Sequence, residues 1–323
     1  MSIRRRSILA AAGLAGVGLA AGPAAAQQRF ASLYMFIPAG PGGGWDGLGR
    51  GIEQVARTAG LVGNFQFENV GGAGGMVGLP RFVSQRRGRG DALMVGGSVM
   101  VGAGITNRSP VSIRDVVPIA RMTEEVGVIV VPANSDFRSI DQLIAALRAN
   151  PGAVSVGGGS AGGTDHITLG LMLKALGRNP REAAYVAFAG GGPAQAAIMG
   201  GQVRAGISGF SEFAEQIKAG RMRALATTGE RRSEPGLPTL KESGLDVVTS
   251  NWRGVFGAPG INAAQRQALT DLMTAVYNTP AWREMLATRG WDDAFLTGPA
   301  FEQYLARDIA ATEGVLRDLG LAT

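Results

Sequence analysis

The sequence predicts an α/β protein of two lobes, built on mostly parallel sheets flanked by helices. Short apolar runs alternate with helix-like stretches between residues 33 and 227, a pattern typical of parallel strands covered by helices. Glycine-rich turns stand where apolar runs give way to helices, and no Ser/Pro-rich linker separates the two halves. A discontinuous pair of lobes fits this pattern better than two consecutive domains.

The expected elements follow the chain in order. The first run has strands at 33–37, 65–70 and 92–96, with helices from 46 to 58 and up to about 85. After a pause at 102–110, a second run has strands at 116–120, 126–131, 153–157, 184–188, 203–208 and 222–227, with helices at 139–149, 164–176, 192–199 and 212–219. The tail has a strand within 247–256 and helices at 263–277, 281–289 and 299–319.

The alternation also suggests where the chain changes lobes. We expect crossings near residues 100 and 225. Lobe 1 would then comprise residues 27–100 and 226–323, and lobe 2 would comprise residues 101–225. Ligands of such sheets bind at the carboxyl ends of the strands, in the crevice between elements.

Residues 1–26 have the features of an export signal. Three arginines at 4–6 precede an apolar stretch at 8–21 and a small-residue cleavage site at 24–26. The start also resembles a twin-arginine signal. The chain has no cysteine, so it has no disulfide framework and no lipid-anchor site, which is consistent with a bacterial periplasm.

The charge balance argues against nucleic acid as a partner. The formal net charge of +6 includes the three arginines of the leader, and without them 28 basic residues face 25 acidic ones. One histidine and scattered carboxylates supply no recognisable metal site. We therefore expect no metal and no cofactor.

A glycine loop after the first strand is the main candidate site. Gly42, Gly43, Gly44, Trp45 and Asp46 follow an apolar run and open a helix. Glycines let a ligand approach the main chain, and the first-turn amides of a helix are unpaired and partly positive. We expect this loop to hold a carboxylate. The same residues also fit a dinucleotide-binding G-x-G-x-x-G turn, with Glu68 in the position of the ribose-binding acid, and a ligand-free turn remains a third interpretation.

A second glycine loop repeats the arrangement. The residues proposed to bind a ligand here are Ser160, Ala161, Gly162, Gly163, Thr164 and His166. The loop also matches the G-x-S-x-G elbow of serine hydrolases, but the single histidine lies in the helix directly after it, which is the wrong order for that triad. His166 fits a hydrogen-bonded supporting role better than a direct ligand contact.

Three further residues complete the candidate set. Gly191 lies in another strand–loop–helix corner whose amides could face the same cleft. Arg253 lies within an apolar strand, where its planar fork would suit either a ligand carboxylate or an internal salt bridge. Ser208 ends the strand at 203–208.

Six motifs follow one another in order along the mature chain. They are Pro-Ala-Gly-Pro-Gly-Gly-Gly-Trp-Asp at 38–46, Glu-Asn-Val-Gly-Gly-Ala-Gly-Gly at 68–75, Gly-Ser-Ala-Gly-Gly-Thr-Asp-His at 159–166, Gly-Gly-Gln-Val at 200–203, Ile-Lys-Ala-Gly-Arg-Met-Arg-Ala-Leu-Ala at 217–226 and Pro-Thr-Leu at 238–240. This ordered set resembles the receptors of tripartite tricarboxylate transporters, the TctC or Bug family. The resemblance covers essentially the whole mature chain. It implies a type II-like Venus-flytrap fold that closes on a small organic anion and delivers it to membrane permease subunits without catalysis, most simply as a monomer.

The resemblance also implies something about the ligand. Many relatives carry Asp-Asn where this chain has Ser208 and Gly209, and that aspartate is associated with amino-bearing or otherwise polar ligands. Its absence favours a purely anionic ligand, and the segments around Trp45 and Arg253 resemble the tricarboxylate-type subgroup. The sequence thus predicts a periplasmic receptor for a citrate-like di- or tricarboxylate. The alternatives are an exported dinucleotide-dependent oxidoreductase and a receptor that presents its ligand to a membrane sensor.

Overall fold

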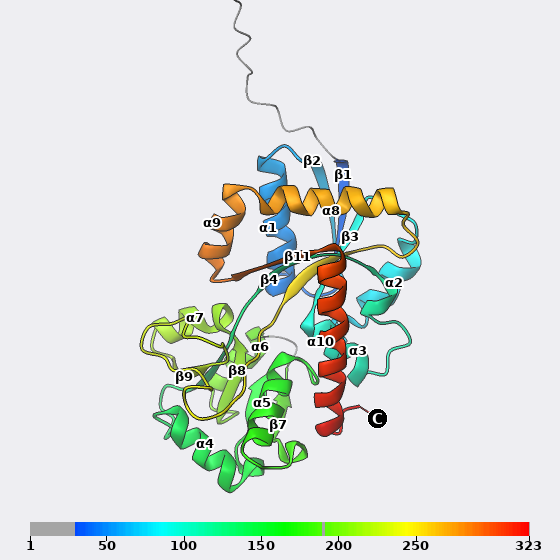
Figure 1. Cartoon of the computed structure of the whole chain (residues 1–323). Helices are drawn as coiled ribbons and strands as arrows, with labels where there is room; N and C mark the ends of the chain where they lie inside the picture. The colour runs from blue at the N-terminus through cyan, green and yellow to red at the C-terminus, as the bar shows by residue number, and fades with distance from the viewer. Residues whose placement is uncertain (1–29, 189–190, 323) are drawn as a thin grey trace, which may run out of the picture.

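The computed structural model describes residues 30–188 and 191–322, which form two lobes, each built on a mixed sheet (Figure 1). The predicted export signal lies outside the described residues. The six-stranded sheet defines lobe 1 and has the order β11-β4-β10-β3-β1-β2. Its strands are β1 Phe30–Ile37, β2 Val62–Asn69, β3 Ala92–Gly97, β4 Val117–Glu124, β10 Arg253–Gly257 and β11 Asp292–Thr297.

The five-stranded sheet defines lobe 2 and has the order β7-β6-β8-β5-β9. Its strands are β5 Gly127–Pro132, β6 Val156–Gly158, β7 Tyr185–Ala187, β8 Ala205–Gly209 and β9 Met222–Thr227. The α/β class with helices on the sheets is confirmed, but the sheets are mixed rather than mostly parallel. The pairings β1–β2, β1–β3, β6–β7 and β6–β8 are parallel, whereas every pairing that involves β4, β5, β9, β10 or β11 is antiparallel.

Helices cover both sheets and follow the strands of the alternating runs. They are α1 Gly44–Thr58, α2 Gly78–Gln85, α3 Ser98–Thr106, α4 Ile140–Ala149, α5 Thr164–Ala175, α6 Gly191–Met199, α7 Phe210–Lys218, α8 Ala263–Tyr277, α9 Pro280–Arg289 and α10 Gly298–Asp318. The pause expected at 102–110 is partly wrong, since α3 occupies its first half. This helix is apolar on all sides and its exposed face is small, so its sequence shows no helical periodicity.

The chain changes sheets later than predicted. Strand β4 belongs to lobe 1 and β5 to lobe 2, so the first crossing lies at Glu125 and Val126 and not near residue 100. Strand β9 still belongs to lobe 2, and the return crossing lies just before Arg253 and not near residue 225. The prediction was wrong because two consecutive apolar strands look alike in sequence, whichever sheet each of them joins.

Helix α10 spans both lobes (Figure 1). Its first half contributes Phe301, Leu305 and Ile309 to the core of lobe 1. Its far end packs on α5 of lobe 2, where a Cβ built on Gly170 would lie 2.5 Å from Leu319 Cδ2.

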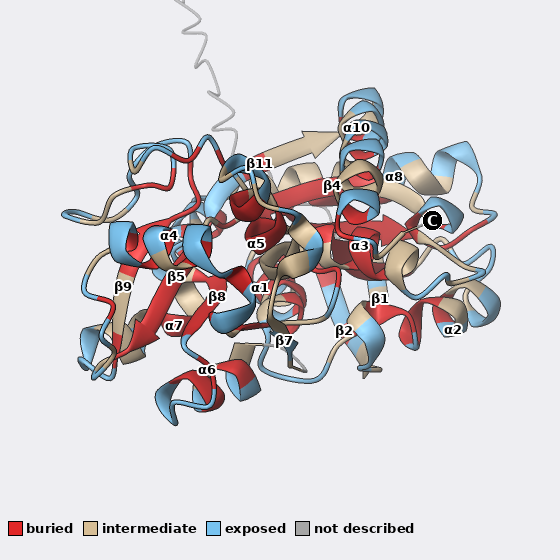
Figure 2. Ribbon diagram, turned by 90° about the horizontal axis from the view of Figure 1, so that it is seen from below, coloured by how far each residue is buried: buried red, intermediate tan, exposed pale blue. Residues whose placement is uncertain are grey.

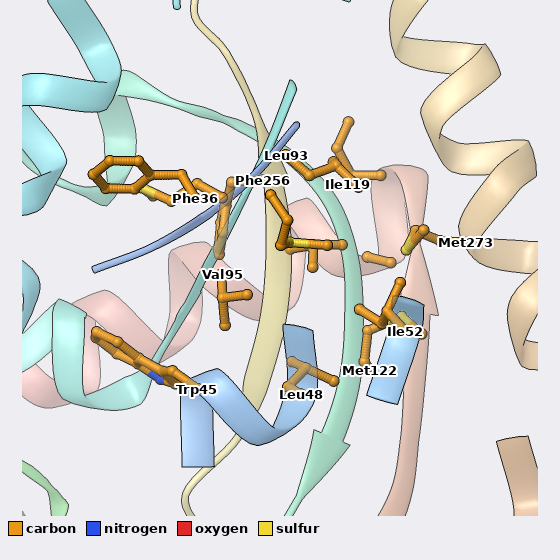
Figure 3. Close-up of a cluster of buried hydrophobic side chains, with 14 of the residues drawn as sticks. Phe36, Trp45, Leu48, Ile52, Leu93, Val95, Ile119, Met122, Phe256 and Met273 are labelled. Carbon is orange, nitrogen blue, oxygen red and sulfur yellow. The ribbon is translucent and has the colours of Figure 1, made fainter. Parts of the chain in front are cut away.

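Each lobe has its own hydrophobic core. In lobe 1, residues from β1, β3, β4 and β10 pack against α1 and α8, as the labelled side chains of Figure 3 show, from Phe36 and Trp45 to Met273. Lobe 2 buries separate apolar clusters on the two faces of its sheet. The central strands β3, β8 and β10 are buried throughout, whereas the edge strands β2, β7 and β11 are partly exposed (Figure 2). Burial of the central strands is the pattern of helix-covered sheets.

Candidate functional site

The carboxyl ends of the parallel strands of both sheets meet at the crossing between the lobes. In lobe 1, the last residue of β3, Gly97, pairs with Arg253, the first residue of β10 after the return crossing. In lobe 2, the last residue of β8, Gly209, pairs with Gly127, the first residue of β5 after the outward crossing. The loops that follow β1, β3, β6 and β8 therefore face the same region, where ligands of α/β sheets bind.

The first glycine loop leaves its helix start without a side-chain cap. Gly42 has a φ of +87°, which favours glycine, and the N-cap residue Gly43 provides no side chain to accept from the first-turn amides of α1. Gly40, Gly42 and Gly43 are exposed, and a Cβ at any of them would meet nothing within 4 Å. This loop can therefore present bare amides to a ligand.

Asp46 organises the first loop from within α1. Its Oδ2 accepts a hydrogen bond from the Gly42 amide at 3.0 Å, and its Oδ1 accepts one from Asn69 Nδ2 at 3.0 Å. Burial would raise the pKa of the Asp46 carboxyl, but these hydrogen bonds, together with nearby Arg50, hold it below its ordinary value. Both oxygens are engaged, so Asp46 shapes the loop and stays ionised there.

The second glycine loop has the same construction. Gly162 has a φ of +74°, the N-cap Gly163 makes no side-chain cap, and the Gly162 amide donates to His166 Nδ1 at 3.2 Å. In both loops a positive-φ glycine therefore donates to the side chain four residues later, inside the following helix. The two loops share this hydrogen-bond construction, one in each lobe, but Gly162 and Gly163 are buried whereas Gly42 and Gly43 are exposed.

Hydrogen bonds fix the flanks of the second loop. The Gly159 amide donates to Asp165 Oδ2 at 2.7 Å, and Tyr185 Oη donates to the Gly159 carbonyl at 2.9 Å. Burial raises the pKa of Asp165 to about 7, although the Gly159 hydrogen bond opposes this. Within the loop, Ala161 is exposed, Ser160 and Thr164 are half-buried, and Thr164 Oγ1 approaches Asp165 Oδ1 at 3.4 Å.

His166 and Trp45 support the loops through their side chains. The imidazole of His166 stacks on the ring of Tyr185 with centroids 4.2 Å apart, and burial lowers its pKa to about 4. A neutral ring is what the hydrogen bond from Gly162 requires. Trp45 is 7% exposed and belongs to the core of lobe 1, so it can meet a ligand only through its main chain.

Arg253 lies at the crossing, in an ion pair with Glu125. Its Nη2 is 2.6 Å from Glu125 Oε2, and each side chain is 1% exposed. A Cβ built on Gly44 would lie 2.7 Å from Nε and Nη2, so the guanidinium lies directly against the start of α1. Among the residues that the structure describes, its Nε and Nη1 have no hydrogen-bond partner. The internal salt bridge is therefore present, and two donors remain beside the first loop.

Ser208 and Gly191 lie together around a residue that no sequence motif indicated. Ser208 Oγ donates to Glu212 Oε2 at 2.8 Å, and a Cβ on Gly191 would lie 1.8 Å from the same oxygen. Burial is the main cause of a raised pKa for Glu212, although Ser208 and Arg253 act in the opposite direction. The only sequence signal was its spacing, one helical turn after Ser208 at the start of α7.

Three further observations concern the parts of the described structure outside the glycine loops. A cavity of about 540 Å³ between α7, β9 and residues 234–237 shares no lining residue with either glycine loop. Within residues 30–188 and 191–322, no group of three or more Asp, Glu or His side chains is placed to hold a metal ion. Across that same part of the chain, no helix combines the length and apolarity that crossing a bilayer requires.

A family model described as the tripartite tricarboxylate transporter family receptor, TctC, matches residues 57–321. The chain belongs to this family of receptors. Its predicted kinship is thereby confirmed, together with a solute-binding rather than an enzymatic function. Receptors of this family are periplasmic, bind small organic acids and work with transporter permeases. The dinucleotide-dependent oxidoreductase is thus excluded as an interpretation of the first loop.

Among similar proteins, Protein BugT of Bordetella pertussis is 27% identical over 314 residues, 95% of each chain. The alignments with such relatives cover between 59% and 95% of the relative's own length. Two structures from Rhodopseudomonas palustris share the fold. MatC with bound malate is 21% identical, with a TM-score of 0.75, and the match covers 88% of this chain and 98% of MatC. Rpa4515 with adipate is 22% identical, with a TM-score of 0.79, and the match covers 90% of this chain and 98% of Rpa4515.

Proposed function

We propose that the protein captures a citrate-like di- or tricarboxylate between its lobes and delivers it to the permease of a tripartite tricarboxylate transporter. The observation that carries this proposal is the pair of uncapped helix starts, one in each lobe, at the crossing. An acid with two carboxylates could place one against each helix start. Closure of the lobes would then be driven by the ligand itself.

The proposed contacts use main-chain amides more than side chains. The residues are Gly42, Gly43, Gly44, Trp45 and Asp46 in the first loop, and Ser160, Ala161, Gly162, Gly163, Thr164 and His166 in the second. The amides at the start of α1 and α5 have no acceptor within their helices, and the helix dipole adds partial positive charge there. A carboxylate supplies the missing acceptor and the opposite charge.

Gly191, Ser208 and Arg253 complete the proposed site. The unsatisfied Nε and Nη1 of Arg253 can donate to a carboxylate bound at the start of α1. Gly191 begins α6, and Ser208 is the last residue but one of β8, at the carboxyl edge of its sheet. The bound acids of MatC and Rpa4515 support a small carboxylate as the class of ligand.

Calorimetric titration of residues 27–323 with citrate, isocitrate, tricarballylate, malate and succinate tests capture. At least one acid should bind, and at 100 times its dissociation constant it should stabilise the fold by roughly 2.7 kcal/mol. Binding of none of them would contradict the proposed class of ligand.

A single variant separates binding from folding. Gly43→Asp supplies an N-cap acceptor to α1, so stability should hold or rise while affinity falls, because the new carboxylate occupies the amides and repels the ligand. The matched control is Thr279→Asp, which exchanges one N-cap acceptor for another at the start of α9, outside the loops. Unchanged affinity in Gly43→Asp would remove the first loop from the site.

Export and delivery need experiments in cells. We propose that residues 1–26 direct export to the periplasm and that the protein then acts as a monomer with its permease. Cells without the protein should lose uptake of the radiolabelled acid, and a chain without residues 1–26 should not restore it. Intact uptake with a lost transcriptional response to the acid would instead indicate a membrane sensor as the partner.

A further inference from the structure

Glu212 brings a carboxylate to the place where two of the proposed ligand residues lie. Its Oε2 accepts the hydrogen bond from Ser208 Oγ at 2.8 Å and lies against the main chain of Gly191 at the start of α6. The Gln195 side chain also donates to the Glu212 carbonyl at 3.0 Å, which ties α6 to α7. The carboxylate is therefore held at the carboxyl edge of the lobe 2 sheet.

Unsatisfied polar atoms around Glu212 indicate a missing partner. Its second oxygen, Oε1, accepts no hydrogen bond from any residue in the described ranges 30–188 and 191–322. Within the same described residues, the Nε and Nη1 donors of Arg253, a side chain that is 1% exposed, are also without partners. Buried donors normally have partners, whereas the free oxygen of Glu212 belongs to a side chain that is only partly buried. The junction therefore offers two buried donors and one open acceptor.

We infer that Glu212 selects acids that carry a hydroxyl group, because its carboxylate accepts a hydrogen bond from that hydroxyl. The inference rests on the proposed function. A plain dicarboxylate offers only acceptors and would face Glu212 with like charge. A 2-hydroxy acid offers one donor beside its carboxylates, so it can satisfy Glu212 while a carboxylate meets Arg253 or a helix start. Ser208 holds the Glu212 carboxylate in position for this contact.

This inference differs from what the sequence suggested at this position. Ser208 and Gly209 lack the aspartate that many relatives have, which favoured a purely anionic, citrate-like ligand and indicated no acidic side chain at this strand end. In the structure, Glu212 of α7, four residues after Ser208, places a carboxylate at the same strand end. The acidic group is thus supplied by a different element.

Matched pairs of acids test the inference in the mature protein. Malate differs from succinate by one hydroxyl, and citrate differs from tricarballylate in the same way. A hydrogen bond to a charged acceptor corresponds to roughly 10- to 100-fold in affinity. We expect the wild type to prefer the hydroxy acid of at least one pair by that factor, and Glu212→Ala to reduce the ratio to about one, mainly through weaker binding of the hydroxy acid.

Two further variants complete the design. Glu212→Gln keeps an acceptor oxygen without the charge, so its preference should lie between those of the wild type and Glu212→Ala. Glu215→Ala removes an exposed carboxylate from the same helix and should leave the ratio unchanged. Circular dichroism melting checks that each variant folds, and Glu212→Gln decides the outcome if Glu212→Ala does not fold.

The outcomes separate this inference from the proposed function. Equal affinities within both pairs, or an undiminished preference in Glu212→Ala, would overturn the role of Glu212 and leave carboxylate capture standing. Tighter binding of aspartate than of malate by the wild type would overturn the hydroxyl assignment in favour of an ammonium group. If none of the acids binds, the proposed function falls and this inference with it.

Discussion

Single residues hold each glycine loop in a shape that leaves the first-turn amides of the following helix without a side-chain cap. Gly42 donates to Asp46 and Gly162 donates to His166, in each case four residues ahead. The acceptor lies inside the helix, so it fixes the loop without covering the N-cap position. The acceptor is a carboxylate in the first loop and a neutral imidazole in the second, so the two loops should respond differently to pH.

Replacing Asp46 by alanine should destabilise the protein. The variant loses hydrogen bonds from Gly42 and Asn69, so we expect the free energy of unfolding to fall by about 1–2 kcal/mol, together with weaker ligand binding. Urea unfolding measures the first effect. Gln54→Ala, at an exposed position of the same helix, should change stability little, and an equal loss in both variants would argue against the role of Asp46.

Asp165 and His166 should have opposite effects on the pH dependence of stability. Folding raises the Asp165 pKa from 3.8 to about 7, so its contribution to stability is full below pH 3.8 and is lost as pH rises through 7. Folding lowers the His166 pKa from 6.5 to about 4, so its contribution is full above pH 6.5 and is lost as pH falls through 4. Between these limits the two contributions largely offset each other.

A variant that lacks either Asp165 or His166 should reveal the pH dependence of stability that the other residue contributes. In Asp165→Asn, the free energy of unfolding should rise between pH 4 and 6.5 more steeply than in the wild type, because only the His166 contribution remains. In His166→Asn it should fall over the same interval. Urea unfolding at several pH values measures both slopes, and parallel profiles for wild type and variants would contradict the assignment.

Residue-level prediction from sequence succeeded where a local motif existed. The glycine loops and their helix starts follow from strand, glycine and helix signals within a few residues. The partner of Arg253 is Glu125, 128 residues earlier, and no local pattern connects them. Glu212 was missed for a related reason, since an acidic residue near the start of a surface helix is common and only the fold brings it to Ser208.

At the level of elements, α3 and the second glycine loop join the lobes through a close backbone contact. A Cβ built on Gly102 in α3 would lie 1.9 Å from the Gly162 carbonyl oxygen. A contact this close requires a glycine, and it places α3 of lobe 1 directly beside the site. We expect the fit of these two elements to limit how closely the lobes can approach each other.

Gly102→Ala should therefore weaken ligand binding by preventing full closure. Alanine favours a helix over glycine by roughly 1 kcal/mol, so any loss must come from the clash. Gly104→Ala is the matched control in the same helix, because its Cβ would lie 3.7 Å from Met76 Sδ and fits without strain. Calorimetry measures the affinity of each variant for the ligand, and small-angle scattering measures its radius of gyration with ligand bound. Equal values for Gly102→Ala and Gly104→Ala would mean that the backbone at Gly162 shifts easily to make room for the added methyl group.

Two errors of the sequence prediction concern the sheet that a strand joins and the presence of a helix. The apolar strands β4 and β5 are separated by only two residues, yet they belong to different sheets. Helix α3 lacks a polar stripe because it is covered by neighbours on most sides, including η1 (Ala73–Gly75), α5 and α10. Both errors concern which element lies beside which, and pairing partners are not encoded in a strand's own periodicity.

At the level of the whole molecule, α10 fastens lobe 2 to lobe 1. Leu319, just past its end, is 6% exposed and packs on Gly170, whereas the Lys174–Asp318 ion pair beside it is largely exposed. Apolar burial should dominate this contact, since surface ion pairs contribute little.

The two contacts can be compared directly. Leu319→Ala should lower the free energy of unfolding by about 2 kcal/mol or more and speed amide exchange in α5, because it leaves a void over Gly170. Lys174→Met should change stability by less than about 0.5 kcal/mol. A larger effect from Lys174→Met than from Leu319→Ala would show that charge, not packing, holds the end of α10.

The two crossing segments are themselves paired, and this limits how the lobes can move. Glu125 and Asn251 exchange main-chain hydrogen bonds in both directions, and Val126 forms a bridge with Ser250. A two-stranded ribbon bends across its face far more readily than it shears or unwinds. Opening should therefore follow one rocking axis, so a single pair of fluorophores, one on each lobe, would suffice to follow the whole capture cycle.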